Sequence, residues 1–537
     1  MKIKYFICVF LGLLEITAYA QNVDSLYYRF LEIKTGQKYL PEENNTGNEY
    51  IEKSGTSLIN KVKLNLNLFT KEQQTVIKPL LARPVSETSI VSQSGKFRIH
   101  YDTQGENKPA FDVNVIAAIF DSVYQFEVET LGYLAPPSDF GSGGDDLYDI
   151  YVINLPTGIY GYTETEQYLS GDTYTTFMVV DNDYVGYYSK GLNGLRVTAA
   201  HEFHHAIQMG RYILREEDTF YYEITSTAME EFTFSYVNDY FYYVKSFMNT
   251  PSRSLKEYSY NLAIWNIYLK EKYGYDIIKR TWELMRTKTA MNAIAAAIEE
   301  YGSTFKAELS NFGTWVYFSG YRHKTDKYFP DAKYFPALKI SMSYSFVPPL
   351  QIIGVNSNSA SNNFIRFGYG ADTVVTIITN GDYLSSGNMT WVDYSLRNTE
   401  QEDFIKINEG YYYKYQVPEV NKKYFCSSAI FNDSSSYNNG TGNISYVYPQ
   451  PFTYLTDSEY GLNLPVKIKT DVGVNLYIYD INMNLLYAGV HNFISGPNPY
   501  INFNGITDKG RLSSGVYIFV TESEGNILKG KFAVLND

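Results

Sequence analysis

The chain has 537 residues, of which 45% are hydrophobic, so it is too long for one compact core and predicts roughly three domains of about 150 residues each. The formal net charge is −13, and no run of basic residues is longer than a pair, which argues against nucleic acid as a partner. Only 19% of the residues are charged and 17% are aromatic, which is typical of folded domains rather than of a disordered chain.

Residues 1–20 have the pattern of a secretory signal peptide. Met1–Lys4 is a basic start, Tyr5–Leu14 is an apolar run, and Ala18–Ala20 offers a small-residue cleavage site. The apolar run is too short to span a bilayer, and no later segment approaches about 20 apolar residues, so we expect no transmembrane segment. Cleavage would remove Cys8 and leave Cys426 as the single thiol, which excludes an intrachain disulfide.

Residues 21–90 are expected to form an N-terminal segment that is either a propeptide or an extension of the next domain. The sequence from Asn22 to Arg83 is polar and irregular, and Pro41–Gly47 has the composition of a loop.

Residues 91–330 begin with strand patterns and continue with helical ones. Strands are expected at Phe97–Tyr101, Asp149–Leu155 and Thr175–Val180, with a helix over Val113–Leu131, which gives a β-α-β-β order. Helical spacing dominates from Leu192 to Phe318 and predicts helices over Tyr260–Tyr273, Asp276–Met285, Thr289–Tyr301 and Phe305–Phe318. Gly274 and Gly302 stand where helices should end.

The remainder of the chain is strand-like. In residues 331–445, short alternating runs such as Thr373–Ile378 and Tyr411–Val417 are bounded by Asn, Ser and Gly clusters and predict a β-sandwich domain. A linker over 432–442 precedes residues 446–537, where clean alternation at Val474–Tyr479 and Gly515–Val520 predicts a second, small β-sandwich.

The strongest chemical signal is the H-E-x-x-H motif at His201–His205, which stands in an apolar helical context in a chain with only six His. On a helix, residues i and i+4 project from one face, so His201 and His205 can bind one Zn²⁺ through imidazole nitrogens. Glu202 would lie beside the metal's open position, where it can move a proton from the attacking water to the leaving amine. The alternative is a surface helix with clustered His.

His204 is expected to pack or to support the ligands, because ligation through His204 would break the arrangement that places Glu202. A catalytic zinc site needs a third protein ligand. The extended metzincin pattern requires Gly and His at positions that Gln208 and Arg211 hold here. Glu223, on a second expected helix, is the preferred third ligand.

Two neighbours and two rivals of Glu223 also follow from the sequence. Thr227 and Glu230 share its helix face, so one of them could hydrogen-bond a ligand imidazole. Glu216 and Glu217 are rivals for the third position, although they follow the motif closely in what looks like a solvated loop. A solvated helix face is the remaining alternative for Glu223.

The two segments HEFHHAIQ, at His201–Gln208, and YEITSTAMEE, at Tyr222–Glu231, resemble those of a family of secreted bacterial proteins assigned as zinc metalloproteases. The resemblance spans residues 80–330 and includes SGKFRIHYDT at Ser94–Thr103 and AIWNIYLKEKYG at Ala263–Gly274. It implies a gluzincin-like fold, with His201, His205 and Glu223 as zinc ligands and Glu202 as the catalytic base. His204 replaces an aromatic residue of the family, and Met229 follows Ala228 where the family often has Trp.

Further candidate residues are less specific. Related zinc peptidases use a Tyr or His to stabilise the oxyanion, and Tyr260 and His323 are candidates for this role, with ordinary packing as the alternative. Asp145–Asp146 and Asp181–Asp183 offer oxygen ligands for Ca²⁺, with solvated turns as the alternative.

The C-terminal unit resembles the sorting domain of proteins exported by the type IX secretion system. The resemblance rests on YPQPF at 448–452, IYD at 478–480, SGVYI at 514–518 and a final KF at 531–532. It implies passage across the outer membrane, followed by release or attachment at the cell surface. An ordinary binding appendage is the alternative.

The expected fold class is therefore α+β, with a zincin (gluzincin-like) catalytic domain followed by a β-sandwich domain and a small β-sandwich sorting domain. The expected function is a secreted or surface-attached zinc metallopeptidase that acts on peptides or proteins and is exported by the type IX machinery. The alternative is a cell-surface adhesin or binding protein with a non-catalytic zincin fold. Retention of Glu202 beside both His residues favours the enzyme.

Overall fold

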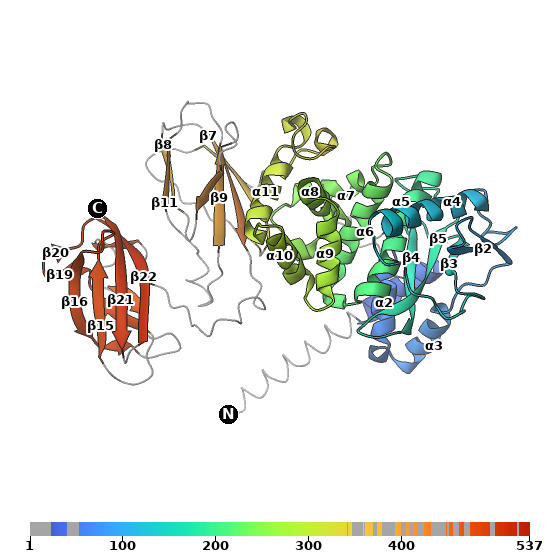
Figure 1. The fold of residues 1–537 in the computed structure, drawn as a ribbon, viewed down its shortest axis with the longest axis horizontal. Helices are drawn as coiled ribbons and strands as arrows, with labels where there is room; N and C mark the ends of the chain where they lie inside the picture. The colour runs from blue at the N-terminus through green and yellow to red at the C-terminus, as the bar shows by residue number, and fades with distance from the viewer. Residues whose placement is uncertain are drawn as a thin grey trace. The chain divides into compact units, whose positions relative to one another are not determined.

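The computed structural model describes residues 23–39 and 53–340 and, beyond them, the stretches 342–345, 358, 360–368, 373–377, 392–398, 404–407, 412–416, 424–430, 447, 451–454, 461–466, 473–494, 500–523 and 526–536 (Figure 1). The expected signal peptide, the loop at Pro41–Gly47 and the linker over 432–442 lie outside the described residues. The predicted α+β class with a β-rich C-terminal region is confirmed. In the described part, no helix has both the length and the apolar character needed to cross a bilayer.

Residues 88–181 contain the five strands of a mixed sheet. In spatial order its strands are β1 (Thr88–Val91), β2 (Phe97–Tyr101), β3 (Tyr148–Ile153), β5 (Tyr174–Asp181) and β4 (Gly161–Tyr168). The strands β2, β3 and β5 run parallel, while β1 and β4 are antiparallel to their neighbours. The sequence patterns predict β2, β3 and β5 but miss β1, which is short and incompletely buried, and β4, whose buried residues are largely polar.

Both faces of the sheet are buried, because the central strands alternate apolar residues between two cores. On one face, side chains of β3 and β5 pack with α4 (Val113–Tyr124) and α5 (Leu192–Ile207); the strand residues are Ile150, Val152, Met178 and Val180. On the other face, Tyr151, Phe177 and Val179 belong to a second core. This second core is completed by the N-terminal segment.

The N-terminal segment is helical where the structure describes it. Residues 23–35 form a helix, and α2 (Thr56–Leu64) and α3 (Lys71–Leu80) follow (Figure 1). Phe30, Ile59 and Ile77 are fully buried in the second core. The expectation of an irregular segment is therefore wrong for these residues, because widely spaced apolar residues among many polar ones are enough to bury one face of each helix.

A lobe of helices follows the sheet. It consists of α6 (Thr219–Thr233), α7 (Tyr240–Asn249), α8 (Ala263–Tyr273), α9 (Asp276–Met285), α10 (Ala290–Glu300) and α11 (Phe305–Tyr317), so the predicted helices are confirmed to within a few residues. Gly274 ends α8 with a φ of 84°, a conformation that glycine adopts readily. Trp265 and Trp282 are fully buried in a core that is continuous with the α4 and α5 side of the sheet.

The middle of the chain forms strands, as predicted. One sheet has the order β10 (Phe404–Ile407), β9 (Val392–Asn398), β12 (Tyr424–Ile430), β7 (Asn363–Gly368) and β6 (Met342–Ser345), and β11 (Tyr412–Gln416) pairs with β8 (Thr373–Ile377). At the start of this region the backbone N–H of Leu255 donates to the carbonyl of Ala360 at 3.0 Å, which ties residue 360 to the helical lobe.

The C-terminal unit, Ser434–Asp537, is a separate compact unit with its own core. One of its sheets has the order β13 (Phe452–Thr453), β22 (Asn526–Leu535), β21 (Gly515–Ser523), β15 (Val474–Tyr479) and β16 (Leu485–His491). A second has the order β14 (Leu462–Pro465), β18 (Tyr500–Phe503) and β17 (Phe493–Ile494), and β19 (Ile506–Thr507) pairs with β20 (Gly510–Arg511). Leu464 and Phe503 of the second sheet share the core with Leu476 and Phe519 of the first.

Candidate metal centre

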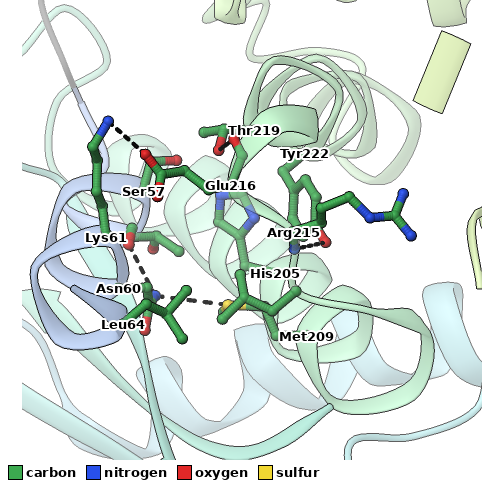
Figure 2. A pocket seen from close by; sticks show the side chains of 12 residues that line it. Ser57, Asn60, Lys61, Leu64, His205, Met209, Arg215, Glu216, Thr219 and Tyr222 are labelled. Carbon is green, nitrogen blue, oxygen red and sulfur yellow. Dashed lines mark hydrogen bonds and ion pairs between the residues drawn. The ribbon is translucent and has the colours of Figure 1, made fainter. Parts of the chain in front are cut away.

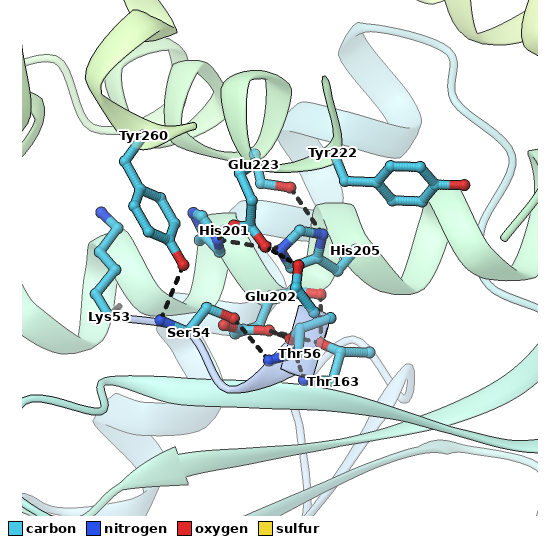
Figure 3. Close-up of polar contacts among 12 residues, drawn as sticks. Lys53, Ser54, Thr56, Thr163, His201, Glu202, His205, Tyr222, Glu223 and Tyr260 are labelled. Carbon is cyan, nitrogen blue, oxygen red and sulfur yellow. Dashed lines mark hydrogen bonds and ion pairs between the residues drawn. The ribbon is translucent and has the colours of Figure 1, made fainter. Parts of the chain in front are cut away.

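Three side chains from α5 and α6 converge at one point. His201 and His205 project from α5 one turn apart, and Glu223 reaches them from α6 (Figure 3). One ligand atom from each residue lies within 4.8 Å of the other two. In the part of the chain that the structure describes, these three residues are the one group of His, Cys, Asp and Glu side chains with this geometry. The motif and the preferred third ligand therefore meet in space.

The separations between these atoms suit a zinc ion. The Nε2 atoms of His201 and His205 are 3.1 Å apart, and a Glu223 carboxylate oxygen is 3.1 Å from the first and 3.4 Å from the second. Ligand atoms about 2.0–2.2 Å from a tetrahedral zinc ion are about 3.3–3.6 Å apart. The three atoms could thus bind one ion with little movement.

Two further side chains fix the orientation of the imidazoles. Nδ1 of His201 lies 2.7 Å from Oε1 of Glu230, and Nδ1 of His205 lies 2.8 Å from Oε1 of Gln208. Because these oxygens accept a hydrogen bond, each Nδ1 carries the proton and each Nε2 presents its lone pair to the centre. Three electron-rich atoms therefore face one another, an arrangement that a cation stabilises.

The electrostatics of the site also favour a positive charge. Burial alone would lower the pKa of His201, but its hydrogen bonds to Glu223 and Glu230 outweigh this effect and raise the pKa to about 9. Burial would raise the pKa of Glu223, but His205 and His201 hold it well below its ordinary value. Both pKa shifts show that the surroundings of these side chains favour a positive charge at the centre.

Glu202 lies beside the three converging residues and has a different set of partners. Its carboxylate accepts hydrogen bonds from the hydroxyl of Thr56 at 2.7 Å and from that of Thr163, on β4, at 2.9 Å. The close approach of α5 to β4 depends on Gly161, since a Cβ there would come within 2.8 Å of Thr198. The carboxylate is thus held next to the centre without being one of its three ligands.

His204 lies in different surroundings, and its Nδ1 is 2.8 Å from a carboxylate oxygen of Glu127. Both side chains are completely buried. Burial raises the pKa of Glu127, and burial together with the neighbouring His205 and His201 lowers the pKa of His204. His204 therefore belongs to the packing of α5 against the π-helical turn Gln125–Thr130.

Of the residues that the sequence predicts to support the ligands, the structure brings some to the site and others not. Glu230 contacts His201, whereas the buried hydroxyl of Thr227 has no hydrogen-bond partner among the described residues. The Tyr260 ring lies 5.7 Å from the His201 ring, and its hydroxyl accepts a hydrogen bond from the Ser54 N–H at 3.4 Å (Figure 3). His323 instead lies 3.0 Å from the Gly320 carbonyl oxygen.

The rival ligands lie outside the centre. Glu216 pairs with Lys61 at 2.7 Å, and the side chain of Glu217 is 66% exposed. The acidic clusters considered for Ca²⁺ have partners within the protein. Arg98 pairs with Asp145, and Asp181 accepts hydrogen bonds from the N–H groups of Leu155 and Tyr184. Calcium binding at these clusters stays a prediction.

Sequence reasoning missed several contacts of the site. Gln208 stands three positions after His205, and this helical spacing could have indicated its role. Lys53, Thr56 and Ser57 reach the site from the N-terminal segment, at sequence separations of more than 140 residues. No local pattern could have indicated contacts over such separations.

Comparisons with known proteins add little. No protein-family model matches the chain, and no curated protein matches it either. A solved structure described as "Biofilm associated protein - BSP domain" is similar over 32% of this chain and 30% of its own length, with 11% sequence identity and a TM-score of 0.10. This chain therefore spans less than a third of that structure, and a TM-score this low carries no argument about fold or function.

Proposed function

We propose that the chain is a zinc metallopeptidase with a gluzincin-like catalytic domain, in which His201, His205 and Glu223 hold the metal and Glu202 is the general base. The observation that carries this proposal is the separation of roles among the four side chains. Three of them converge within 4.8 Å, whereas Glu202 stands beside them with hydroxyl partners. Structural zinc sites have four protein ligands, whereas catalytic sites keep one position open.

Each residue of the site has its own role in the proposed hydrolysis. Zinc, when bound, supplies a Lewis acid that polarises the scissile carbonyl and lowers the pKa of water. Glu202 accepts a proton from the attacking water and delivers it to the leaving nitrogen. Glu230 and Gln208 keep the two imidazoles in one orientation. Tyr260, whose ring lies beside that of His201, is the proposed donor of a hydrogen bond to the developing oxyanion.

The adhesin alternative explains less of the site. A binding protein could retain a metal group for stability, but it has no need for a buried carboxylate held beside that group. Glu202 is 1% exposed, and Thr56 and Thr163 offset the cost of burying it. The peptidase proposal accounts for all four side chains.

A zinc-loading experiment tests the proposal. We expect about one Zn²⁺ per chain by elemental analysis, because one group in the described part has the required geometry. We also expect casein cleavage that chelation abolishes and added zinc restores. Cleavage should be assayed both before and after the chain is cut in the loop over 82–87. Bound zinc without any cleavage of a broad peptide library would favour the adhesin alternative. A chain that binds no zinc under zinc-replete conditions would contradict the proposed metal site.

We further propose that residues 1–20 direct secretion and that the C-terminal unit is a type IX sorting domain, which would place the enzyme outside the cell or on its surface. The separate core of Ser434–Asp537 supports this role, since a sorting domain has to fold independently of its cargo. Removal of residues 446–537 should leave the product in the periplasm of a host with type IX machinery, as measured by immunoblotting of cell fractions. Normal export of the truncated chain would contradict the sorting role.

A further inference from the structure

The N-terminal segment lies directly over the candidate metal centre. Ser54 forms a parallel β-bridge with Gly161 at the start of the edge strand β4. The N–H of Gly55 donates to the carbonyl of Gly161 at 3.0 Å, and the N–H of Tyr160 donates to the carbonyl of Lys53 at 2.7 Å. Residues 53–55 thus lie along the free edge of the sheet and hydrogen-bond to it through a single β-bridge and its neighbouring backbone groups.

The next two residues contact both carboxylates of the site. The Thr56 hydroxyl donates to Glu202 at 2.7 Å, and the Ser57 hydroxyl donates to Glu223. The Thr56 oxygen also accepts a hydrogen bond from the Thr163 N–H at 2.8 Å, which fixes its position. The proposed base and one proposed ligand are therefore both engaged by the chain's own hydroxyl groups.

The site is closed as a consequence. His201, Glu202 and Glu223 are 2%, 1% and 3% exposed, so an extended peptide cannot reach the base and the ligands together. A small, open pocket reaches His205 from one side, and α2 forms one wall of it with Asn60, Lys61 and Leu64 (Figure 2). A peptidase with this site can act only after residues 53–64 move away.

Ion pairs, hydrogen bonds and apolar packing hold the segment in place, and among the ion pairs Lys63 is paired with the buried Glu164. The ammonium group of Lys53 is buried between Glu230, at 2.6 Å, and Asp239, at 2.8 Å. The apolar face of α2 packs on the sheet, with Ile59 completely buried. When the segment leaves, Glu230 and Asp239 become open to water, which replaces the lost cation as their partner.

The connection between the segment and the sheet is exposed at Val85, whereas Arg83 in the same connection is anchored by ion pairs with Asp139, Asp149 and Glu166. Residues 82–87 join α3 to β1 without regular structure, and Val85 is 94% exposed. Exposed loops of this kind are preferred sites of proteolysis. Hydrolysis of one peptide bond here by an endopeptidase adds water across the C–N bond, gives a carboxylate and an amine, and leaves the segment attached by non-covalent contacts alone.

We propose that residues 53–64 are an autoinhibitory plug of the metal centre and that cleavage in the loop over 82–87 allows the plug to leave. This inference rests on the proposed peptidase function. It assigns Thr56 and Ser57 the task of engaging the base and one ligand, and it gives the N-terminal segment the role of a propeptide rather than that of a permanent part of the domain.

The test uses the full chain with a recognition sequence for a site-specific endopeptidase inserted after Val85. The metal-free protein is treated with diethylpyrocarbonate before and after cutting, and the modified imidazoles are located by mass spectrometry. We expect His201 and His205 to react at least about tenfold faster after the cut, whereas His204, completely buried against Glu127, stays protected. A second chain carries the same insertion after Gly105, in another exposed loop, and its cleavage should leave all three imidazoles protected.

The outcomes separate the plug from the peptidase. Faster modification together with a rise in casein cleavage of at least about 100-fold supports both. Faster modification without cleavage in either form supports the plug and removes the peptidase function. Measurable casein cleavage that is equal before and after the cut, or protection of the imidazoles that persists after it, overturns the plug. As a second route, Ile59→Asp should expose His201 and His205 in the uncut chain, because it places a charge in the apolar contact of α2, whereas Thr75→Asp on the exposed face of α3 should not.

Discussion

Replacing Glu202 by Gln is expected to lower casein cleavage by about 10²- to 10⁴-fold, the usual contribution of a general base. This loss corresponds to about 3–5 kcal/mol of transition-state stabilisation. The amide has nearly the shape of the carboxylate, but it cannot accept the proton of the attacking water. The measurement is kcat/KM on the chain cut in the loop over 82–87, with zinc content measured on the same sample.

Zinc binding and thermal stability should change little in the Glu202→Gln variant. Glu202 is not among the three converging residues, and the hydroxyls of Thr56 and Thr163 can both accept and donate, so they can pair with an amide. Glu216→Gln is the matched control, because Glu216 is a sequence-based rival that pairs with Lys61 at the surface. Full activity in Glu202→Gln, or an equal loss in the control, would remove Glu202 from the role of base.

The candidate site was predictable from sequence where its contacts are local in the helices. His201 and His205 are one helical turn apart, and their convergence follows from that spacing. Glu223 required a further assumption, that α6 packs against α5. Helical phase then grouped Thr227 and Glu230 with Glu223, but it could not decide between them, because the contact of Glu230 with His201 depends on how the two helices are placed.

The sheet and the N-terminal segment were harder to predict for a common physical reason. β4 carries Thr163, Glu164 and Thr165 at buried positions, so it lacks the apolar alternation that marks a strand. These residues are satisfied by partners from the N-terminal segment, such as the side-chain oxygen of Asn60, which accepts from the Thr165 N–H at 2.9 Å. Buried polar residues whose hydrogen-bond partners are distant in the sequence produce no periodic pattern of apolar residues. A strand of this kind is therefore not recognised from a single sequence.

Replacing Glu223 by Gln is expected to lower zinc affinity by more than the roughly 10- to 100-fold that loss of an outer hydrogen-bond partner causes. The carboxylate supplies both a ligand atom and the negative charge that the cation requires, and the neutral amide is a poor substitute for zinc. Competition with a chromogenic chelator at fixed pH measures the affinity. Casein cleavage should fall together with zinc occupancy and recover in part at high zinc concentration, because both imidazoles remain in place.

The control for Glu223 is its other rival, Glu217→Gln. The Glu217 side chain is 66% exposed, and its nearest cation is Arg215, with a nitrogen–oxygen distance of 3.9 Å, so loss of its charge should leave zinc affinity unchanged. A loss of affinity in Glu217→Gln that equals the loss in Glu223→Gln would mean that the third ligand comes from the loop before α6. In that case Glu223 would contact the imidazoles and Ser57 without binding the metal, and the plug would hold a carboxylate that is not a ligand.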